Sequence, residues 1–411
     1  MTSPVSVTVE DGIALVLIDN PPVNAISRAV RRGILDSVAR IDADESVRAA
    51  VLACAGRTFV AGADIKEFGL PPVEPHLPDV LFAIEASRVP WVAAVHGTAL
   101  GGGLELGLAC HARVAHADAK LGLPEVTLGL VPGAGGTVRL PRLVALDDAI
   151  GMVTSGKPAD AKKAEAIGLI DRIAEGDLVA EARAYTADLI QVGKPQAVSQ
   201  RSPREIPGDD FWTEKEKTVA AKARGQASPV EALKALRDGV TLPVTQAFAA
   251  ERARFLRLRD SEEAAALRYM FFAERNTGRP VEIDGIEPLP LKYAGVVGGG
   301  TMGAAIAAAM LMAGLKVALV ERDTSAAAKA AERVAEILDG SRKRGLLSEA
   351  AYEDALSRFS AHDDYAAFAG SDLVIEAVFE DMGVKKNVFA ELDRVCRDDA
   401  ILASNTSYLD V

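Results

Sequence analysis

The apolar and polar residues of the first hundred positions form short runs that predict strands alternating with helices. Two apolar runs, 5–9 and 13–18, flank Asp11-Gly12, an arrangement typical of a β-hairpin. Residues 27–41 carry apolar side chains at the three- and four-residue spacing of a helix that faces a core. Strands that alternate with helices indicate an α/β domain. The elements expected next are a strand at 49–56, a helix at 80–87 and a strand at 90–97.

The stretch ALGGGLELGLAC, residues 99–110, places three consecutive glycines beside a carboxylate in apolar surroundings. We expect Gly102 and Gly103 to open a helix, whose first N–H groups have no partner within the helix. Ala61 and Gly62, in the sequence VAGAD, form a second turn of small residues. Two N–H groups that converge on one point form an oxyanion hole, so these two turns are candidates for one.

Two carboxylates, Glu105 and Glu125, lie in these apolar stretches. Paired carboxylates beside an oxyanion hole suit proton transfer at a carbon next to a carbonyl. The residue pattern alone leaves simpler roles open, because Glu105 would also satisfy a helix N-terminus and Glu125 would also suit a loop. His96 and His111 flank the glycine-rich helix. We expect packing or surface roles for both histidines, since the two glutamates already supply an acid and a base.

The chain changes character after about residue 145. Long, Ala-rich, charged segments predict helices from there to about 285, including one at 246–276. Residues 277–293 are rich in Pro and Gly and are interpreted as the main domain boundary. A strand, a glycine turn and a helix follow, with further strands expected at 371–380 and 400–405. This order predicts parallel βαβ units.

A glycine motif opens this last region. Gly298, Gly300 and Gly303 have the spacing G-x-G-x-x-G between a predicted strand and a predicted helix, as in dinucleotide-binding folds. Glu321 ends the second strand, where a carboxylate binds the ribose hydroxyls, and this favours NAD. The neighbouring Arg322 leaves NADP open, and a glycine-rich turn without a ligand is the simpler alternative.

Composition and charge narrow the function classes. The chain has 411 residues, 49% of them hydrophobic, and a net charge of −12, which suits two or three globular domains. The basic stretch 252–259 is flanked by acidic residues, so we expect a solvated helix face and no nucleic-acid partner. No apolar run is long enough for a membrane helix, and the N-terminus lacks a signal-peptide pattern. Cys54, Cys110 and Cys396 are scattered, which argues against disulfides and zinc and favours a cytoplasmic location.

Three blocks of the first 190 residues resemble the signature blocks of the crotonase (enoyl-CoA hydratase/isomerase) superfamily. They are TFVAGADIKEF, VHGTALGGGLELGLACHARVA and LGLPEVTLGLVPGAGGTVRLPRLV. The resemblance implies a spiral of ββα units and an acyl-CoA thioester as the substrate. The site residues that it implies are Ala61 and Gly102 for the oxyanion hole, Glu105 and Glu125 for catalysis, and Asp64 and Lys66 for contacts with CoA.

The reaction implied by the resemblance is hydration of a trans-2-enoyl-CoA to a 3-hydroxyacyl-CoA in fatty-acid β-oxidation, with Δ3–Δ2 isomerisation as a side activity. Because Glu105 and Glu125 are both present, hydration is favoured over other crotonase chemistries such as dehalogenation or decarboxylation. A non-enzymatic scaffold that binds CoA and NAD is an alternative of another class, but it leaves the paired glutamates unexplained.

The residues after the boundary resemble the N-terminal domain of 3-hydroxyacyl-CoA dehydrogenase. The matching blocks are VVGGGTMGAAIAAAMLMAGLKVALVERD, SDLVIEAVFEDMGVKKNVFAELD and ILASNTSYLDV. The resemblance implies NAD as the cofactor and places Ser407 at the substrate hydroxyl. The cofactor-binding residues expected from it and from the glycine motif are Gly298, Gly300, Thr301, Met302, Gly303, Glu321, Glu380 and Lys385.

The two domains in this order are similar to a peroxisomal-type multifunctional β-oxidation enzyme, and EAAALRYMFFAERN resembles its linker helix, which packs back on the hydratase domain. We expect an α/β architecture with a crotonase core at 1–190, C-terminal and linker helices at 191–285, and a partial Rossmann NAD-binding domain at 286–411. A thiolase is a candidate partner, and the oligomeric state is left open.

One departure from the dehydrogenase pattern concerns its catalytic His, which lies beyond the position matched by Ser407, whereas this sequence ends at Val411. We therefore expect a C-terminally truncated form of a longer parent that holds NAD without dehydrogenase turnover. An early natural stop is the alternative.

Overall fold

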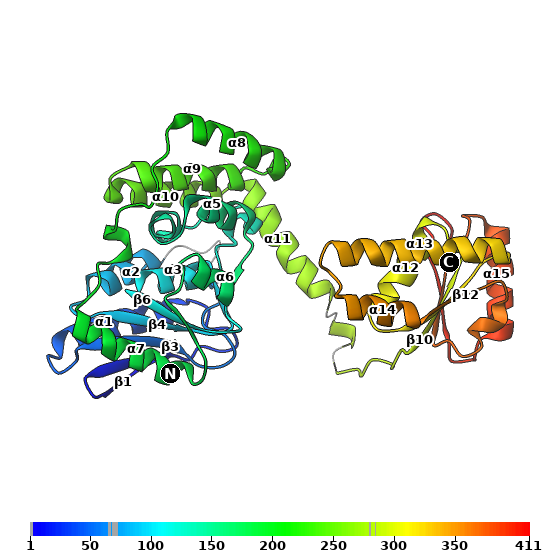
Figure 1. Ribbon diagram of the computed structural model, residues 1–411, viewed down its shortest axis with the longest axis horizontal. Coiled ribbons are helices and arrows are strands. Elements are labelled where there is room, and N and C mark those ends of the chain that lie inside the picture. Colours follow the sequence, from blue (N-terminus) through cyan, green and yellow to red (C-terminus); the bar gives the residue numbers. More distant parts are fainter. Residues whose placement is uncertain (1–2, 65–66, 68–72, 279–280, 284) are drawn as a thin grey trace. The chain divides into compact units, whose positions relative to one another are not determined.

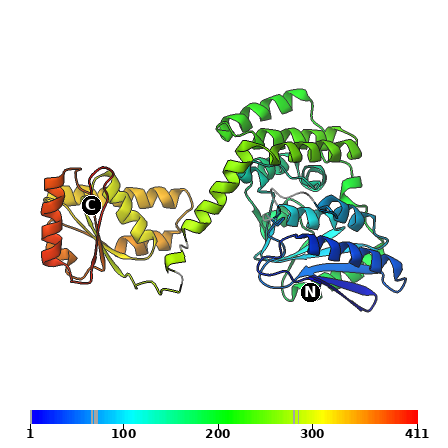
Figure 2. The ribbon, with the colours of Figure 1, turned by 180° about the vertical axis from the view of Figure 1, so that it is seen from behind.

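The computed structural model describes residues 3–64, 67, 73–278, 281–283 and 285–411. The chain divides into two compact units, Met1–Glu282 and Ile283–Val411, which are described separately. Figures 1 and 2 show the ribbon from opposite sides. The division between the units falls beside the boundary predicted near residue 285, and the boundary predicted at residue 190 stays a prediction.

The first unit is built on a six-stranded sheet in the order β1-β2-β3-β4-β6-β9, in which β1 is antiparallel to β2 and the other neighbours are parallel. Three short strands form a second sheet in the order β5-β7-β8. The strands are β1 Val5–Glu10, β2 Ile13–Ile18, β3 Ala49–Cys54, β4 Trp91–Val95, β5 Thr98–Leu100, β6 Ala112–His116, β7 Lys120–Gly122, β8 Ala159–Asp160 and β9 Arg172–Ala174.

Helices cover both faces of the large sheet. The helices of this unit are α1 Arg28–Ala43, α2 Leu77–Ala86, α3 Gly102–Ala109, α4 Gly136–Arg139, α5 Leu146–Ser155, α6 Ala161–Ala166, α7 Leu178–Val192, α8 Asp209–Ala223, α9 Ser228–Thr241, α10 Val244–Arg259 and α11 Glu262–Thr277, with 3-10 turns η2 Glu125–Leu128, η3 Leu140–Arg142, η4 Val198–Gln200 and η5 Val281–Ile283. Helix α7 packs on β3, β4 and β6 from one side, and α2 and α3 lie on the other (Figure 1). All six residues of β3 are therefore buried.

The local sequence explains the start of this fold. Asp11 and Gly12 adopt positive φ angles of 51° and 76°, and the hairpin that they close pairs Val5 with Ile18. Helix α1 begins where the Ser27 side chain accepts a hydrogen bond from the Val30 amide. The predicted hairpin and first helix are confirmed.

The helix predicted at 246–276 is instead two helices, α10 and α11, separated at Asp260 and Ser261. The Ser261 side chain accepts a hydrogen bond from the Ala264 amide, so Ser261 caps the start of a new helix and α10 does not continue into α11. The first turn of α11 packs closely on the end of η2, since Ala264 is buried and a Cβ at Gly129 would lie 2.8 Å from Ala264 Cα. Farther along α11, Tyr269, Met270 and Phe272 are exposed.

The second unit is a five-stranded parallel sheet in the order β12-β11-β10-β13-β14 with helices on its faces. The order reverses between β10 and β13, and ligands of such sheets bind at the carboxyl ends of the strands at that point. Its elements are β10 Tyr293–Val297, α12 Thr301–Met312, β11 Lys316–Val320, α13 Thr324–Lys343, α14 Glu349–Ser357, β12 Phe359–His362, η6 Tyr365–Phe368, β13 Leu373–Glu376, α15 Met382–Val395 and β14 Ile401–Ser404. The predicted parallel βαβ units are confirmed.

Candidate active site

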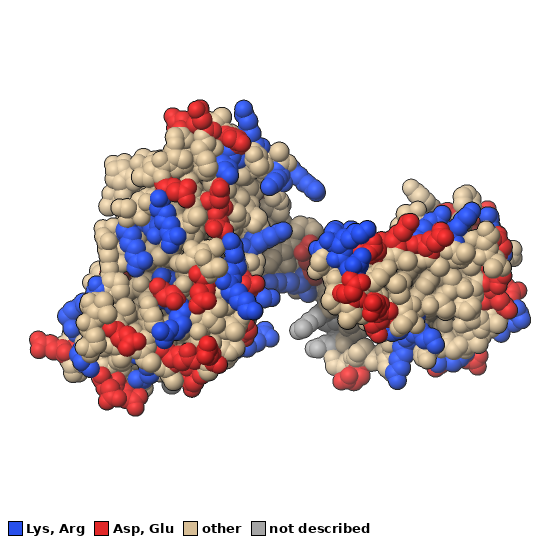
Figure 3. All heavy atoms as spheres, viewed as in Figure 1, with Lys and Arg blue, Asp and Glu red and all other residues tan. Residues whose placement is uncertain are grey.

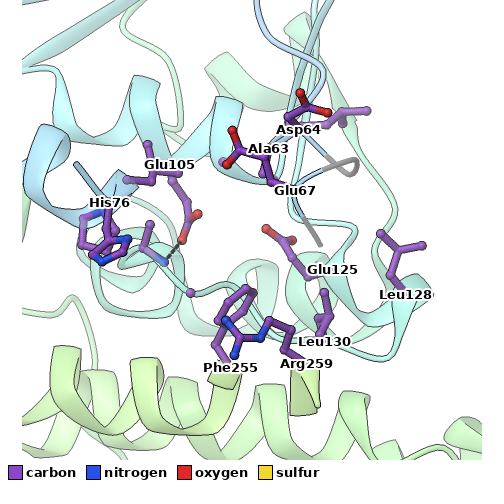
Figure 4. Close-up of a pocket in the computed structure, with 18 of the residues that line it drawn as sticks. Ala63, Asp64, Glu67, His76, Glu105, Glu125, Leu128, Leu130, Phe255 and Arg259 are labelled. Carbon is purple, nitrogen blue, oxygen red and sulfur yellow. Dashed lines mark hydrogen bonds between the residues drawn. The ribbon is translucent and has the colours of Figure 1, made fainter. Parts of the chain in front are cut away.

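A cavity of about 230 Å³ opens in the first unit between the loop that precedes α2, the β5–α3 junction, η2 and α10. Figure 4 shows that Glu105 and Glu125 approach it from different elements, with Phe255 and Arg259 of α10 along another side. The predicted glycine loops and the two predicted carboxylates all line this one cavity.

Two main-chain amides lie close together at one side of the cavity. The Ala63 N atom lies 3.6 Å from the position that a Cβ would take at Gly102. A β-bridge between Val60 and Ala99 fixes the loop against β5, and one between Ile26 and Ala63 fixes it against the segment that precedes α1. Among the described residues, neither the Ala63 nor the Gly102 N–H has a hydrogen-bond acceptor. These two donors are therefore available to a ligand oxygen.

Ala61, which the sequence predicted as an oxyanion-hole donor, has a different arrangement. Its N–H donates to the Val23 carbonyl at 3.2 Å. A donor that is already bonded within the protein cannot also serve a ligand at full strength. The prediction of Ala61 is therefore wrong on this geometry, and the amide two residues along, that of Ala63, is the one beside Gly102.

The consecutive glycines allow α3 to approach this loop closely. A Cβ at Gly103 would lie 2.3 Å from the Val60 carbonyl oxygen, and one at Gly102 would lie 2.9 Å from Leu77 Cδ2. Any side chain here would push α3 away from the loop that carries Ala63. Glycine at these two positions thus has a packing reason.

Glu105 is 2% exposed and projects from the first turn of α3. Its Oε1 accepts hydrogen bonds from the amides of Ala134 and Gly136, both at 2.8 Å. Burial raises the pKa of this carboxyl, and the two amides oppose the rise.

Glu125 begins η2 and has no comparable support. Its Oε2 is shielded from solvent and has no hydrogen-bond partner among the described residues. Burial, reinforced by the charge of Glu105, raises the pKa of Glu125 well above its usual value. An unpartnered buried carboxyl oxygen is costly and is characteristic of a site that binds a polar ligand or water.

Helix α10 supplies cavity residues that the sequence analysis did not identify. Arg252, Phe255 and Arg259 line the cavity from one helix face, at the i, i+3, i+7 spacing. On another face, Arg254 pairs with Asp238 at 2.5 Å. The basic stretch was expected to be a solvated face, and this is wrong because its arginines divide between the cavity and the neighbouring helix α9.

The remaining residues predicted around this site are placed as follows. Asp64 lines the cavity, and Lys66 lies outside the described residues. His96 Nε2 lies 3.1 Å from the Gly56 carbonyl oxygen. His111 is buried and accepts from the Trp91 amide through Nδ1, and burial lowers its pKa to about 4. Neither histidine lines the cavity.

The glycine motif of the second unit forms the turn between β10 and α12. Gly298 has a φ of +91°, and a Cβ at Gly303 would lie 1.7 Å from the Gly298 carbonyl oxygen. At Gly300, by contrast, no atom lies within 4 Å of the Cβ position. The helix thus packs tightly on the turn while open space remains at the second glycine, as pyrophosphate binding requires. Thr301 and Met302 form the exposed first residues of α12.

The carboxylate predicted for ribose lies beside this turn. Glu321 follows β11, and its Oε1 accepts from the Gly299 amide at 2.8 Å. The residues of this unit therefore fit a dinucleotide.

The carboxyl end of β13 carries the other predicted cofactor residues. Lys385 Nζ lies 2.7 Å from Glu376 Oε1 and 3.3 Å from Glu380 Oε2. Glu380 also accepts from the Thr406 hydroxyl and the Ser407 amide, and these donors lower its pKa to about 2. Glu376, which is fully buried, was not predicted. Its position at the end of a buried strand was the available signal.

Other site types find little support in the described part of the chain. There, no group of three or more His, Cys, Asp or Glu side chains is placed to hold a metal ion. None of the helices described combines the length and apolar composition required to cross a bilayer. Positive and negative side chains are interspersed over the faces seen in Figure 3.

Comparison with known proteins defines the class. Residues 8–202 match the family model described as enoyl-CoA hydratase/isomerase, and residues 293–411 match the one described as 3-hydroxyacyl-CoA dehydrogenase, NAD binding domain. The carnitinyl-CoA hydratase of Mycobacterium avium superposes with a TM-score of 0.51 at 30% identity, covering 67% of this chain and 97% of that one. An enoyl-CoA hydratase/isomerase from Pseudoalteromonas atlantica T6c gives a TM-score of 0.50 at 26% identity, covering 66% and 97%. The crotonase fold is confirmed.

The chain thus joins a region that matches enoyl-CoA hydratase/isomerase to one that matches the NAD-binding domain of 3-hydroxyacyl-CoA dehydrogenase, and it is similar over nearly its whole length to bifunctional enzymes of β-oxidation. It is 39% identical to the peroxisomal bifunctional enzyme of Danio rerio over 412 residues, covering 98% of this chain and 56% of the relative. The human enzyme of the same name is 36% identical, with the same two coverages of 98% and 56%. The peroxisomal fatty acid beta-oxidation multifunctional protein AIM1 of Arabidopsis thaliana is 35% identical, covering 100% and 60%. The chain thus spans little more than half the length of these relatives.

The names of these relatives overturn the predicted cytoplasmic location, because they place the enzymes in peroxisomes. Scattered cysteines are compatible with any compartment whose proteins lack structural disulfides. Peroxisomal import depends on a different kind of signal from the N-terminal signal peptide that the sequence analysis considered.

Proposed function

We propose that the first unit hydrates trans-2-enoyl-CoA thioesters to 3-hydroxyacyl-CoA. The observation that carries this proposal is the convergence, on one cavity, of two amides without acceptors among the described residues and two carboxyl groups with raised pKa values, Glu105 buried and Glu125 half-buried with a shielded Oε2. Hydration of a double bond requires one group that takes a proton from water and another that gives a proton to carbon, and the two glutamates can supply both.

The amides of Ala63 and Gly102 donate to the thioester carbonyl oxygen and stabilise the negative charge that develops there. Preorganised donors of this kind each contribute on the order of 2.7–4 kcal/mol to lowering the barrier. The carbonyl then withdraws electrons from the double bond, so that C3 accepts the oxygen of a water molecule.

The environments of the two carboxyl groups suggest their roles. Glu105, whose Oε1 receives two amide hydrogen bonds, is suited to be the carboxylate that takes a proton from the water. Glu125, whose Oε2 has no hydrogen-bond donor among the described residues and whose pKa is raised well above its usual value, is suited to hold a proton and deliver it to C2. Water thereby adds across the double bond, with hydroxyl at C3 and hydrogen at C2, and the pair titrates as a unit. Glu125 alone could move a proton between C2 and C4, which accounts for the proposed Δ3–Δ2 isomerisation.

Arg252 and Arg259 line the cavity and supply positive charge for the phosphates of CoA. The predicted contacts of Asp64 and Lys66 with CoA remain part of the proposal. The second unit is proposed to hold NAD through Gly298, Gly300, Gly303 and Glu321, with Glu380 and Lys385 at the nicotinamide side and Ser407 toward the substrate. When bound, NAD supplies a hydride acceptor. The proposal has three further parts. These 411 residues do not turn over as a dehydrogenase, a thiolase is a partner, and the location is peroxisomal.

The test uses the 411-residue protein with crotonyl-CoA, following the loss of the ultraviolet absorbance of the conjugated thioester. Hydration that falls by about 10²-fold or more in both Glu105→Gln and Glu125→Gln, with CoA binding retained, would support the proposal. No hydration by the wild type would refute it. Incubation with 3-hydroxybutyryl-CoA and NAD, monitored by NADH fluorescence, tests the expected lack of turnover.

A further inference from the structure

Glu251, on α10, is a buried carboxylate for which the hydration reaction provides no step. It is 1% exposed. Its Oε1 accepts from the Gly135 amide at 2.5 Å, and its Oε2 accepts from the Thr137 amide at 2.8 Å and the Thr137 hydroxyl at 2.5 Å. Three donors satisfy the carboxylate and fix residues 135–137 against α10.

The same segment holds Glu105 through its other amides. Ala134 and Gly136 donate to Glu105 Oε1, whereas Gly135 and Thr137 donate to Glu251. Four consecutive amides are thus divided alternately between two carboxylates. Because the amides are linked by short planar peptides, turning one pair away from Glu251 would also turn the other pair away from Glu105.

The segment can adopt this course only with glycine at position 135. Its φ is +103°, and a Cβ there would lie 2.1 Å from Arg139 Nη1 and 2.3 Å from Phe248 Cε1. Arg139 Nη1 in turn donates to the Ala134 carbonyl at 2.7 Å. The segment is therefore held from several directions, and Glu251 provides the contacts from α10.

We propose that Glu251 is a positioning residue for the reaction of this cavity: by holding the amides of Gly135 and Thr137, it keeps those of Ala134 and Gly136 aimed at Glu105. The inference rests on the proposed hydratase function. Since Arg252 and Phe255 of the same helix line the cavity, α10 both borders the substrate and orients the base.

The charges around Glu251 give this role a measurable signature. Facing it are Glu105 from α3, Glu125 from η2 and Arg252 from its own helix, while Arg139 of α4 lies against Gly135. Burial, followed by the charge of Glu105, raises the pKa of Glu251 to about 8. Glu251 therefore loses its proton near pH 8, and because the ionised form is the stronger acceptor for its three donors, kcat is expected to rise through this pH.

The test compares wild type, Glu251→Gln and Thr137→Val in crotonyl-CoA hydration across pH. Glutamine offers one acceptor oxygen where glutamate offers two, so Glu251→Gln is expected to lower kcat on the order of 10²-fold with little change in KM, since misplacement of a reacting group has about this cost. The step near pH 8 in the wild-type kcat profile should vanish. Thr137→Val, which removes one donor, should shift the step to higher pH and lower kcat less.

The control is Glu231→Gln. Glu231 joins α9 to α10 through ion pairs with Arg254 and Arg257, and its side-chain hydrogen bonds and ion pairs within the described residues go to Lys234, Arg254 and Arg257 rather than to residues 134–137. It should reduce thermal stability and leave kcat unchanged. If Glu251→Gln and Thr137→Val both retain the wild-type kcat and pH profile, or if Glu231→Gln lowers kcat equally, the role of Glu251 is refuted. A wild type that does not hydrate crotonyl-CoA would instead refute the proposed function itself.

Discussion

Gly101 leaves the space that the carboxyl group of Glu125 occupies, since a Cβ at Gly101 would lie only 3.0 Å from Glu125 Oε1. Gly101 also has φ 53° and ψ −124°, a conformation that other residues rarely adopt. Glycine at position 101 therefore makes room for the carboxyl group of Glu125, although Gly101 precedes α3 and Glu125 begins η2.

Gly101→Ala is expected to reduce hydration more than it reduces CoA binding. The added methyl group displaces the Glu125 carboxyl, and the backbone strain costs about 1–3 kcal/mol of stability. Steady-state kinetics with crotonyl-CoA and urea unfolding measure the two effects. Both tryptophans of the chain, Trp91 and Trp212, belong to the first unit, so tryptophan fluorescence reports on its unfolding. An unchanged kcat would contradict the proposed position of Glu125.

Glu105→Gln and Glu125→Gln are each expected to lower kcat by about 10²–10⁴-fold, the usual contribution of a general acid or base. The double variant should be little worse than either single one, because the two carboxyl groups act on one water molecule. Glu67→Gln is a matched control, since Glu67 lines the same cavity but pairs with Arg31 at 2.8 Å. A multiplicative loss in the double variant would argue that the two glutamates act independently.

Glu125→Gln should also make the first unit more stable than the wild type, by an amount that increases with pH. The pKa of Glu125 is raised in the folded state, so the folded protein keeps a proton that the unfolded chain loses near its normal pKa of about 4.3. Folding stability then falls with increasing pH, from about 4.3 up to the raised value. Glutamine does not titrate, so the stability difference between the variant and the wild type should grow as the pH rises above about 4.3. Urea unfolding followed by tryptophan fluorescence measures it, and a difference independent of pH would contradict the raised pKa.

The fold could be predicted in large part because its determinants are local. The Asp11-Gly12 turn, the apolar spacing of 27–41 and the glycine motif at Gly298 each act within a few residues of their position. The long helix was mispredicted for the opposite reason. The apolar pattern of 246–276 does not distinguish one continuous helix from two helices. The hydrogen bond by which Ser261 caps α11 makes the difference.

The site was predictable only where motif residues themselves meet the cavity. Glu105 and Glu125 were found, but Ala61 was chosen over Ala63 because the choice depends on the contact with Val23, which is distant in sequence. The α10 residues were missed for a similar reason. Glu251 reaches amides more than 100 positions earlier in the chain, and its own surroundings, AAERAR, read as an ordinary exposed helix.

The two glycines of the nucleotide motif in the second unit should respond differently to alanine. No atom lies within 4 Å of the Cβ position at Gly300, and its φ of −64° is accessible to alanine. Gly300→Ala should therefore fold normally but place a methyl group where the pyrophosphate must approach, weakening NADH binding on the order of tenfold, about 1.4 kcal/mol.

Gly303→Ala places its Cβ 1.7 Å from the Gly298 carbonyl oxygen, so α12 must shift from the turn. We expect a loss of about 1–3 kcal/mol of stability from overpacking, together with loss of NADH binding. NADH fluorescence titration and hydrogen exchange of β10 and α12 distinguish the two variants. If Gly300→Ala binds NADH as tightly as the wild type, the dinucleotide does not approach the backbone at this glycine, and the proposed cofactor site is misplaced.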